Sequence, residues 1–201
     1  MGRKEYSAGM VSLPFWFTEF KKMIQLVNSG MTFPEIKKIN IKENVFSAPT
    51  EYRAAQIFNA VSSRVKTLPP DFYTLFEQSD ITNQKLIVLI SIMENDTLFF
   101  DFMYEVFREK LIIGAEELAD SDFRVFFKEK QIQNGRVAKW TDYTLKRLGR
   151  SYRNVLMETG ILERTTNSTK KIIKPIMDQS LEQKLNERGM AMTLRILTGV
   201  R

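Results

Sequence analysis

The chain has 201 residues, 43% of them apolar, so it is long enough to bury the core of one or two domains. It contains neither cysteine nor histidine. Disulfides, thiolate or histidine metal sites and Ser-His-Asp triads are therefore excluded, and any enzyme would rely on carboxylate, lysine, tyrosine or serine groups. We expect a protein that is not an enzyme and that fits a reducing compartment.

The net charge of +6 is distributed unevenly along the chain. Residues 136–201 carry 14 Lys and Arg against 6 Asp and Glu, whereas residues 1–135 carry 16 against 18. All of the excess positive charge therefore lies in the C-terminal third. Local charge of this kind favours docking of a polyanion there, although an acidic protein or an anionic membrane surface would require a similar charge.

The chain shows no signal for secretion or for membrane insertion. The apolar stretch that follows Arg3 and Lys4 is interrupted by Pro14 and Glu19. The longest apolar run, Leu86–Met93, is far shorter than the roughly 20 residues that span a bilayer. We therefore expect a soluble, cytoplasmic protein with no membrane partner.

Helical patterns dominate the first two thirds of the chain. Apolar residues recur at helical spacing over Phe15–Asn28, and Thr32 with Glu35 forms a capping box for the next helix. Thr50 begins a longer helix that the Pro69-Pro70 pair brings to an end. Further helices are predicted over 71–78, from Asp80 or Thr82 through the apolar run, and over 97–113.

Gly114 is the expected boundary between an N-terminal helical lobe, residues 1–113, and a C-terminal basic lobe, residues 114–201, although the two can pack as one globular unit. Beyond it we expect a short helix over 115–118, a helix over 123–131 capped by Ser121 or Asp122, and a basic helix over 141–157. A hairpin follows, with strands over 161–165 and 170–174 joined by a polar turn at 166–169, and then helices over 179–187 and 190–197. The expected fold class is mainly α, a compact helical bundle with a C-terminal winged-helix-like element that contains one small β-hairpin.

The segment Thr141–Met157 is predicted to be a helix with an apolar face and a basic face on opposite sides. At roughly 100° per residue, Lys146, Arg150 and Arg153 fall within about 60° of one another, opposite the apolar residues. A basic helix followed by a strand, a polar turn and a basic strand is the outline of a winged helix-turn-helix, which reads double-stranded DNA. The alternative is a helix packed on a hairpin whose lysines only keep the protein soluble.

The predicted DNA contacts lie on this helix, just before it and on the hairpin. They are Lys139, Tyr143, Lys146, Arg147, Arg150, Arg153, Asn154, Lys170, Lys171 and Lys174. Several cations on one face without an obvious base-reading pair favour phosphate contact, so we expect binding that is largely independent of sequence. Because only alternate strand residues share a face, Lys170 and Lys171 cannot both face DNA on a regular strand.

The clearest candidate for metal chemistry is the acidic cluster of Glu116, Glu117, Asp120 and Asp122. Such carboxylates can chelate Mg²⁺, but acidic residues also gather at helix N-termini, and this second interpretation is favoured. The sequence contains no glycine-rich phosphate-binding motif. We therefore predict no catalytic residues, no metal and no cofactor.

Four segments form a combined pattern: Tyr6-Ser7-Ala8-Gly9, Glu43–Phe46, the helix that ends in Val65–Leu68, and the stretch from Trp140 to Leu162. Together they resemble the BrxA family, a small component of bacteriophage exclusion (BREX) systems. The resemblance implies a helical fold related to the antitermination factor NusB, binding to double-stranded DNA, and phage defence alongside a methyltransferase, an ATPase and a phosphatase-like protein. The relation to NusB also keeps RNA open as a ligand, and a second basic surface is open at Lys21, Lys22, Lys37 and Lys38.

The leading hypothesis is a non-catalytic, largely sequence-independent double-stranded DNA-binding component of a BREX-type anti-phage system. One alternative is a scaffold whose basic lobe docks an acidic protein partner in the defence complex. Another is a winged-helix transcriptional regulator, which predicts a dimer and a palindromic site.

Overall fold

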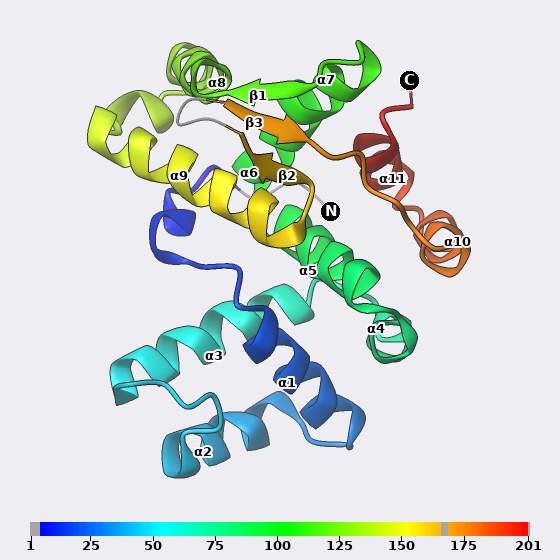
Figure 1. The fold of residues 1–201 in the computed structure, drawn as a ribbon. Helices are drawn as coiled ribbons and strands as arrows, with labels where there is room; N and C mark the ends of the chain where they lie inside the picture. The colour runs from blue at the N-terminus through cyan, green and yellow to red at the C-terminus, as the bar shows by residue number, and fades with distance from the viewer. Residues whose placement is uncertain (1–4, 166–168, 201) are drawn as a thin grey trace. The chain divides into compact units, whose positions relative to one another are not determined.

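A computed structural model describes residues 5–165 and 169–200 of the chain (Figure 1). Its helices and one small antiparallel sheet confirm the mainly α fold class. The chain forms two compact units, Trp16–Asn95 and the combination of Met1–Phe15 with Asp96–Arg201. These limits differ from the boundary expected at Gly114, which stays a prediction, as does the relation to NusB. Within the described ranges, no helix is both long and apolar enough to cross a bilayer.

The unit Trp16–Asn95 is entirely helical in its regular structure. It contains α1 (Phe17–Asn28), α2 (Phe33–Glu43), α3 (Glu51–Val65), α4 (Asp71–Gln78) and α5 (Ile81–Asn95). Helix α1 packs against α3, α4 and α5 and buries Phe20, Met23 and Ile24 completely. The helices predicted from periodicity in this part of the sequence are therefore confirmed.

Local hydrogen bonds account for where these helices begin. The Glu35 carboxylate accepts from the Thr32 hydroxyl at 2.7 Å and from the Thr32 backbone N–H at 2.8 Å, and the second bond completes the predicted capping box. The bond from the hydroxyl, and then the bond from the backbone, lower the pKa of Glu35. Thr50 Oγ1 accepts from the Arg53 N–H at 3.1 Å at the start of α3. Of the two caps considered for α5, Asp80 is the one used: it accepts from the Asn83 N–H at 2.7 Å, a bond that lowers its pKa.

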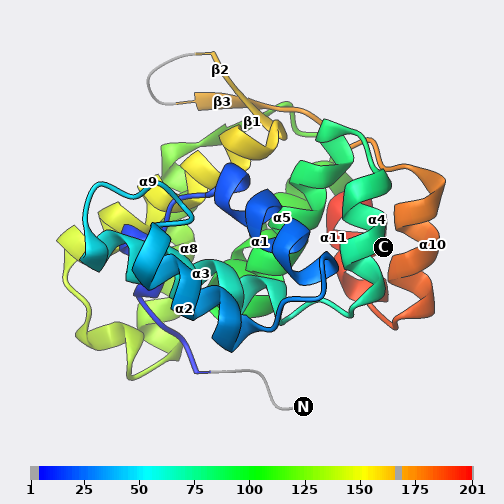
Figure 2. The same ribbon diagram turned by 90° about the horizontal axis from the view of Figure 1, so that it is seen from below.

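The other unit combines helices and helical turns with the sheet. The chain runs through η1 (Gly9–Ser12), α6 (Thr97–Phe102), a π-type turn η2 (Met103–Phe107) and α7 (Arg108–Ile112). After β1 (Glu117–Ala119) come α8 (Asp120–Gln133), η3 (Val137–Lys139) and α9 (Asp142–Thr159), then β2 (Leu162–Arg164) and β3 (Thr169–Ile172). The closing helices α10 (Gln179–Glu187) and α11 (Ala191–Thr198) lie side by side (Figures 1 and 2).

The sheet has the order β1-β3-β2, with both pairings antiparallel. The short helix expected over 115–118 is wrong, because residues 117–119 instead pair with β3, with Leu118 opposite Lys170. Leu118 is thereby buried, an apolar contact that helical periodicity does not reveal. The predicted strands near 161–165 and 170–174 are confirmed with shorter limits, and the turn residues 166–168 lie outside the described part of the chain. In Figure 2 the strands lie beside the C-terminal part of α9, which packs on β2.

An aromatic cluster joins α6, α8 and α9. The rings of Phe102 and Phe123 stack with their centroids 4.7 Å apart, and Tyr152 packs edge-on against Phe99 at 4.8 Å. Helix α8 begins at Asp120, earlier than expected. Asp122 contributes by accepting from the Ala119 N–H at 2.7 Å, whereas Ser121 makes no cap. This core fixes the positions of α8 and α9 relative to each other.

Candidate nucleic-acid interface

Helix α9 has the two faces that its sequence predicts. Thr141 caps its start, because Thr141 Oγ1 accepts from the Thr144 N–H at 3.2 Å, and Gly160 caps its end with a φ of +89°. The whole apolar face is buried, namely Leu145, Leu148, Tyr152, Val155 and Leu156. The opposite face is therefore the one that remains available to a ligand.

Five of the predicted contact residues are exposed on α9 or just before it. They are Lys139, Tyr143, Lys146, Arg150 and Asn154. Tyr143 leaves 69% of its surface accessible, so its hydroxyl is free to reach a ligand. Lys146 and Arg150 are one helical turn apart and therefore share one face.

Arg147 and Arg153 differ from these residues because each is half-buried and holds a neighbouring segment. Arg147 Nη2 donates to the Val11 carbonyl at 3.1 Å, which ties the N-terminal segment to α9. Arg153 Nη2 lies 2.7 Å from Asp120 Oδ1, and its guanidinium sits 5.3 Å from the centre of the Phe123 ring. Their contact with DNA stays a prediction, but both have structural roles as well.

The hairpin lysines alternate between the two faces of β3, as expected. Lys170 is only 3% exposed and its Nζ donates to the Thr169 carbonyl at 3.0 Å, so the structure does not place it at the surface. Lys171 and Lys174 are exposed. Lys171 stands opposite Glu117 and Glu163 in the strand register, so carboxylates partly offset its charge.

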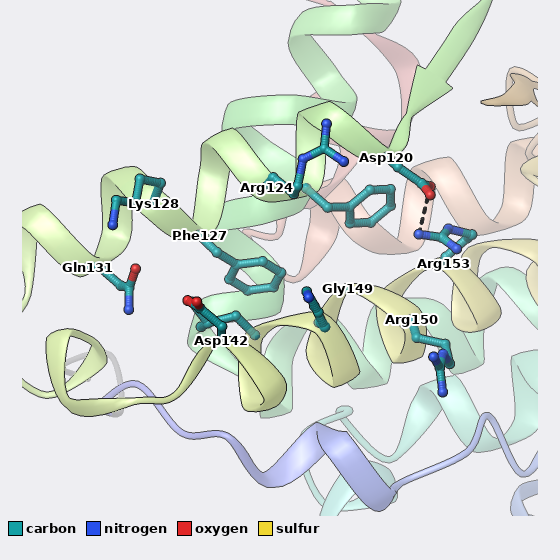
Figure 3. Close-up of a pocket in the computed structure, with 12 residues that line it drawn as sticks. Asp120, Arg124, Phe127, Lys128, Gln131, Asp142, Gly149, Arg150 and Arg153 are labelled. Carbon is teal, nitrogen blue, oxygen red and sulfur yellow. Dashed lines mark ion pairs between the residues drawn. The ribbon is translucent and has the colours of Figure 1, made fainter. Parts of the chain in front are cut away.

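A surface groove with a volume of about 590 Å³ runs between α8 and α9 (Figure 3). Its walls carry polar and charged side chains from both helices: Asp120, Arg124, Lys128 and Gln131 from α8, and Asp142, Lys146, Arg150 and Arg153 from α9. The remaining lining is provided by Phe123, Phe127, Leu145 and Gly149. A Cβ on Gly149 would lie 3.5 Å from Phe123 Cβ and 3.6 Å from Phe127 Cε2, so α9 approaches α8 closely at this point.

The charge of this groove is predominantly positive. Its lining includes five cationic side chains and two carboxylates, and Asp120 is already engaged by Arg153. Arg124 and Lys128, both exposed, are the cations that sequence reasoning missed. Their spacing of four residues, opposite the buried Phe126 of the same helix, is the signal that identifies a solvent-facing basic edge.

A second, smaller groove of about 270 Å³ lies on the other side of α9, against Val11–Phe15. Arg147, Asn154 and Glu158 line it, together with Arg150, which lines both grooves. The exposed edge of α9 is therefore a ridge between two grooves. The groove on the α8 side carries more cations.

Two members of the acidic cluster, Asp120 and Asp122, make contacts within the protein. Asp120 pairs with Arg153, and Asp122 pairs with Lys110 at 2.8 Å in addition to its bond at the start of α8. Over residues 5–165 and 169–200, no three carboxylates are grouped so that they could hold a metal ion. These contacts agree with the helix-start interpretation of the cluster.

The fold and the basic edge of α9 define a small, mainly α protein in which a cationic helix is held against a second helix and a three-stranded sheet. The chain belongs to the BrxA family, whose sequence model matches residues 4–189. It is 37% identical over 194 residues to the BREX protein BrxA of Bacillus cereus (strain H3081.97), a match that covers 96% of each chain. The resemblance noted in the sequence is thus confirmed.

The same fold occurs in the crystal structure of an uncharacterized protein from Magnetospirillum magneticum. The two share 16% sequence identity with a TM-score of 0.81, over 98% of this chain and 100% of the other. At this level of identity, the similarity concerns the fold alone.

Proposed function

We propose that the protein is a non-catalytic component of a BREX anti-phage defence system and binds double-stranded DNA largely without regard to sequence. Its family membership and its relative named as a BREX protein support the defence role. Other BREX components are then its expected protein partners, and the cytoplasm, where DNA is accessible, is its expected location.

The observation that carries the DNA-binding proposal is the pair of exposed cations, Lys146 and Arg150, on the ridge formed by α9. Neither side chain has an ion-pair partner among the described residues, whereas Arg153 beside them is held by Asp120. The energy of nonspecific DNA binding comes mainly from such cations, because each phosphate contact releases condensed counterions.

The order of elements supports the same proposal. Helices α8 and α9, then the strands β2 and β3, with β1 added beside β3, follow the order of a winged helix-turn-helix. In that arrangement the second helix of the pair, here α9, enters the major groove. Lys171 and Lys174 on and after β3 would then approach the DNA backbone beside it.

Weak sequence preference follows from the chemistry of the exposed edge. Specific reading relies on bidentate pairing of Arg with guanine or of Asn with adenine. Arg150 and Asn154 are the exposed α9 side chains capable of it, and they stand beside lysine and tyrosine groups suited to phosphates. Backbone contact therefore outweighs base reading at this surface.

The test is fluorescence anisotropy with a labelled random 30-base-pair duplex, titrated at several salt concentrations with single-stranded DNA and RNA competitors. Wild-type protein is expected to bind with a steep salt dependence, and unrelated duplex is expected to compete equally well. Lys146→Glu/Arg150→Glu should lose binding at physiological salt. Reversing Arg153 is a poorer choice, because that change also breaks its ion pair with Asp120.

The matched control is Lys42→Glu/Lys66→Glu, which reverses two exposed cations of the unit Trp16–Asn95, one on α2 and one directly after α3. It should retain most of the affinity. No binding by the wild type at low salt would exclude the proposal and leave the adaptor that docks an acidic protein. Preference for one palindromic duplex would instead identify a transcriptional regulator.

A further inference from the structure

The groove between α8 and α9 has cations on both walls. Arg124 and Lys128 belong to α8, and Lys146 and Arg150 to α9, and the groove also has an apolar lining. Figure 3 shows Arg124 and Lys128 on α8 and Arg150 on α9. Arg124 and Lys128 are exposed, and no ion pair is recorded for either within the described residues. The α8 cations therefore have no structural task that competes with binding a ligand.

The two ends of the groove differ from its middle. At one end Asp120 is paired with Arg153, and Gln131 and Asp142 line the other end (Figure 3). Gln131 lies eleven residues after Asp120 on α8, a rise of about 16 Å at 1.5 Å per residue. Positive charge is thus concentrated in the central part of a trough, with a carboxylate at each end.

We infer that this groove receives one sugar–phosphate strand of the bound duplex, with Arg124 and Lys128 of α8 contacting its phosphates. The inference rests on the proposed DNA-binding function and adds a second helix to the interface. When the second helix of a helix-turn-helix lies in the major groove, the first crosses the adjacent backbone. Helix α8 occupies the position of that first helix.

The linear arrangement favours a strand over a small anion. Each wall carries its two cations four residues apart, about 6 Å along the helix, so the charges form two rows instead of converging on one point. The trough is also long compared with a single phosphate. The phosphates of a continuous polyanion can contact the cations of both rows at the same time. The apolar lining can pack against the deoxyribose groups between those phosphates.

The groove on the other side of α9 is less suited to a strand. Arg147, its main cation besides Arg150, donates to the Val11 carbonyl, and Glu158 adds a carboxylate to the lining. Like charge disfavours a phosphate there. The groove on the α8 side of α9 is therefore the favoured path for the DNA backbone. Arg150 lies on the ridge between the two grooves and contacts the DNA backbone at the edge of this path.

The experiment uses the full chain carrying Arg124→Gln/Lys128→Gln, with the random 30-base-pair duplex in fluorescence anisotropy at several salt concentrations. If both residues contact phosphates, the slope of log affinity against log salt should decrease in magnitude by about 1.8, at about 0.9 per contact. A change of about 1.8 in this slope makes binding of the duplex by the variant roughly 60-fold weaker than binding by the wild type at 0.1 M salt. Unfolding in urea should be unchanged, since both side chains are exposed.

The control Lys42→Gln/Lys66→Gln removes the same charge from the unit Trp16–Asn95 and should alter the slope little. An unchanged slope in the α8 variant, with intact wild-type binding, would overturn the inference and leave the proposed function standing. Equal losses in both variants would overturn it as well, because binding would then depend on net charge alone. If the wild type fails to bind, the proposed function itself is lost.

A further arm titrates AMP and inorganic phosphate against the bound duplex at constant ionic strength. The strand inference predicts that both compete only weakly, in the millimolar range or above. Displacement by AMP at concentrations far below those of phosphate would identify a pocket for a small nucleotide and would contradict the inference.

Discussion

Arg153 and Asp120 form an ion pair that joins α9 to the first residue of α8. The Nη2 atom of Arg153 lies 2.7 Å from Asp120 Oδ1, and the guanidinium covers the Phe123 ring at 5.3 Å. Sequence periodicity assigns Arg153 to the same basic face as Arg150, yet one is half-buried and the other exposed. Two neighbouring arginines of one face therefore have different tasks.

This difference predicts separate effects on stability. Arg153→Ala should lower the free energy of unfolding by about 1–2 kcal/mol, because it removes a partly screened ion pair and a cation–π contact. Arg150→Ala should stay within about 0.5 kcal/mol of the wild type, as is usual for an exposed side chain. Urea-induced unfolding measures both values. Equal stabilities of the two variants would contradict the structural role of Arg153.

Gly149 and Gly199 differ in backbone conformation and in the space available for a side chain, so we expect substitutions at the two positions to have different effects on stability. Gly149 lies within α9, where a Cβ meets its neighbours at ordinary contact distances of 3.5 Å and 3.6 Å. Gly149→Ala should therefore be neutral or stabilising by up to about 1 kcal/mol, since alanine favours a helix. Gly149→Leu should destabilise the protein by about 1–3 kcal/mol, because a large side chain would push α8 away from α9.

Gly199 behaves in the opposite way. It has a φ of +69°, and a Cβ there would come within 2.7 Å of Leu111 Cβ. Gly199→Ala should lower the free energy of unfolding by about 1–2 kcal/mol through strain and overlap. Thermal unfolding of the two Ala variants, side by side, tests the pair. A Gly199→Ala variant as stable as Gly149→Ala would show that the chain after α11 adapts freely.

Tyr152 predicts a dependence of stability on alkaline pH. Burial, and then the nearby charges of Asp96 and Asp101, raise its pKa well above the ordinary value of 10.0. The folded protein therefore retains a proton that the unfolded chain releases. The stability associated with this group is complete below pH 10 and is lost as the pH rises toward the raised pKa.

Tyr152→Phe removes this dependence. Its hydroxyl has no hydrogen-bond partner among the described atoms, so the variant should be as stable as the wild type near neutral pH. At pH 11 the variant should be more stable than the wild type by about 1.4 kcal/mol, the linkage energy of one pH unit. Urea unfolding at pH 8 and pH 11 tests this. Some alkaline loss should persist, because burial also raises the pKa of Tyr73.

Tyr6 anchors the N-terminal segment of its unit. Its hydroxyl donates to Asp101 Oδ2 at 2.5 Å, near Lys130, whose Nζ lies 2.5 Å from Glu105 Oε1. Tyr6→Phe should lower the free energy of local opening of the N-terminal segment by about 1.5–3 kcal/mol, the range for a hydrogen bond to a charged group. Hydrogen exchange should then accelerate at Val11 and Leu13, whose amides donate to the carbonyls of Ala8 and Met10. Tyr143→Phe, at an exposed position, is the control and should leave these rates unchanged.

Local signals in the sequence determined most of the helices. Capping residues such as Thr32, Thr50 and Thr141 form their bonds within three residues of the helix start, so the sequence alone locates them. The amphipathic pattern likewise predicts which face of α9 is buried. The absence of histidine and cysteine limited the chemistry, and the uneven charge indicated the basic C-terminal third.

Pairing between distant segments was decided only in the tertiary structure. Strand β1 has three residues and becomes a strand because β3, about fifty residues further along the chain, supplies its partners. The same pairing buries Lys170 and leaves Lys171 exposed. Short strands carry too little periodicity to be recognised without that partner.

In the candidate interface, too, some features follow from the sequence and others depend on tertiary packing. The sequence alone identifies a basic face on α9, but it cannot show that Asp120 engages Arg153 or that Arg124 and Lys128 border the same groove. These relations depend on the packing of α8 on α9 around Phe123 and Phe127. Helical periodicity reports which face of a helix is buried, whereas only packing brings the side chains of two helices together.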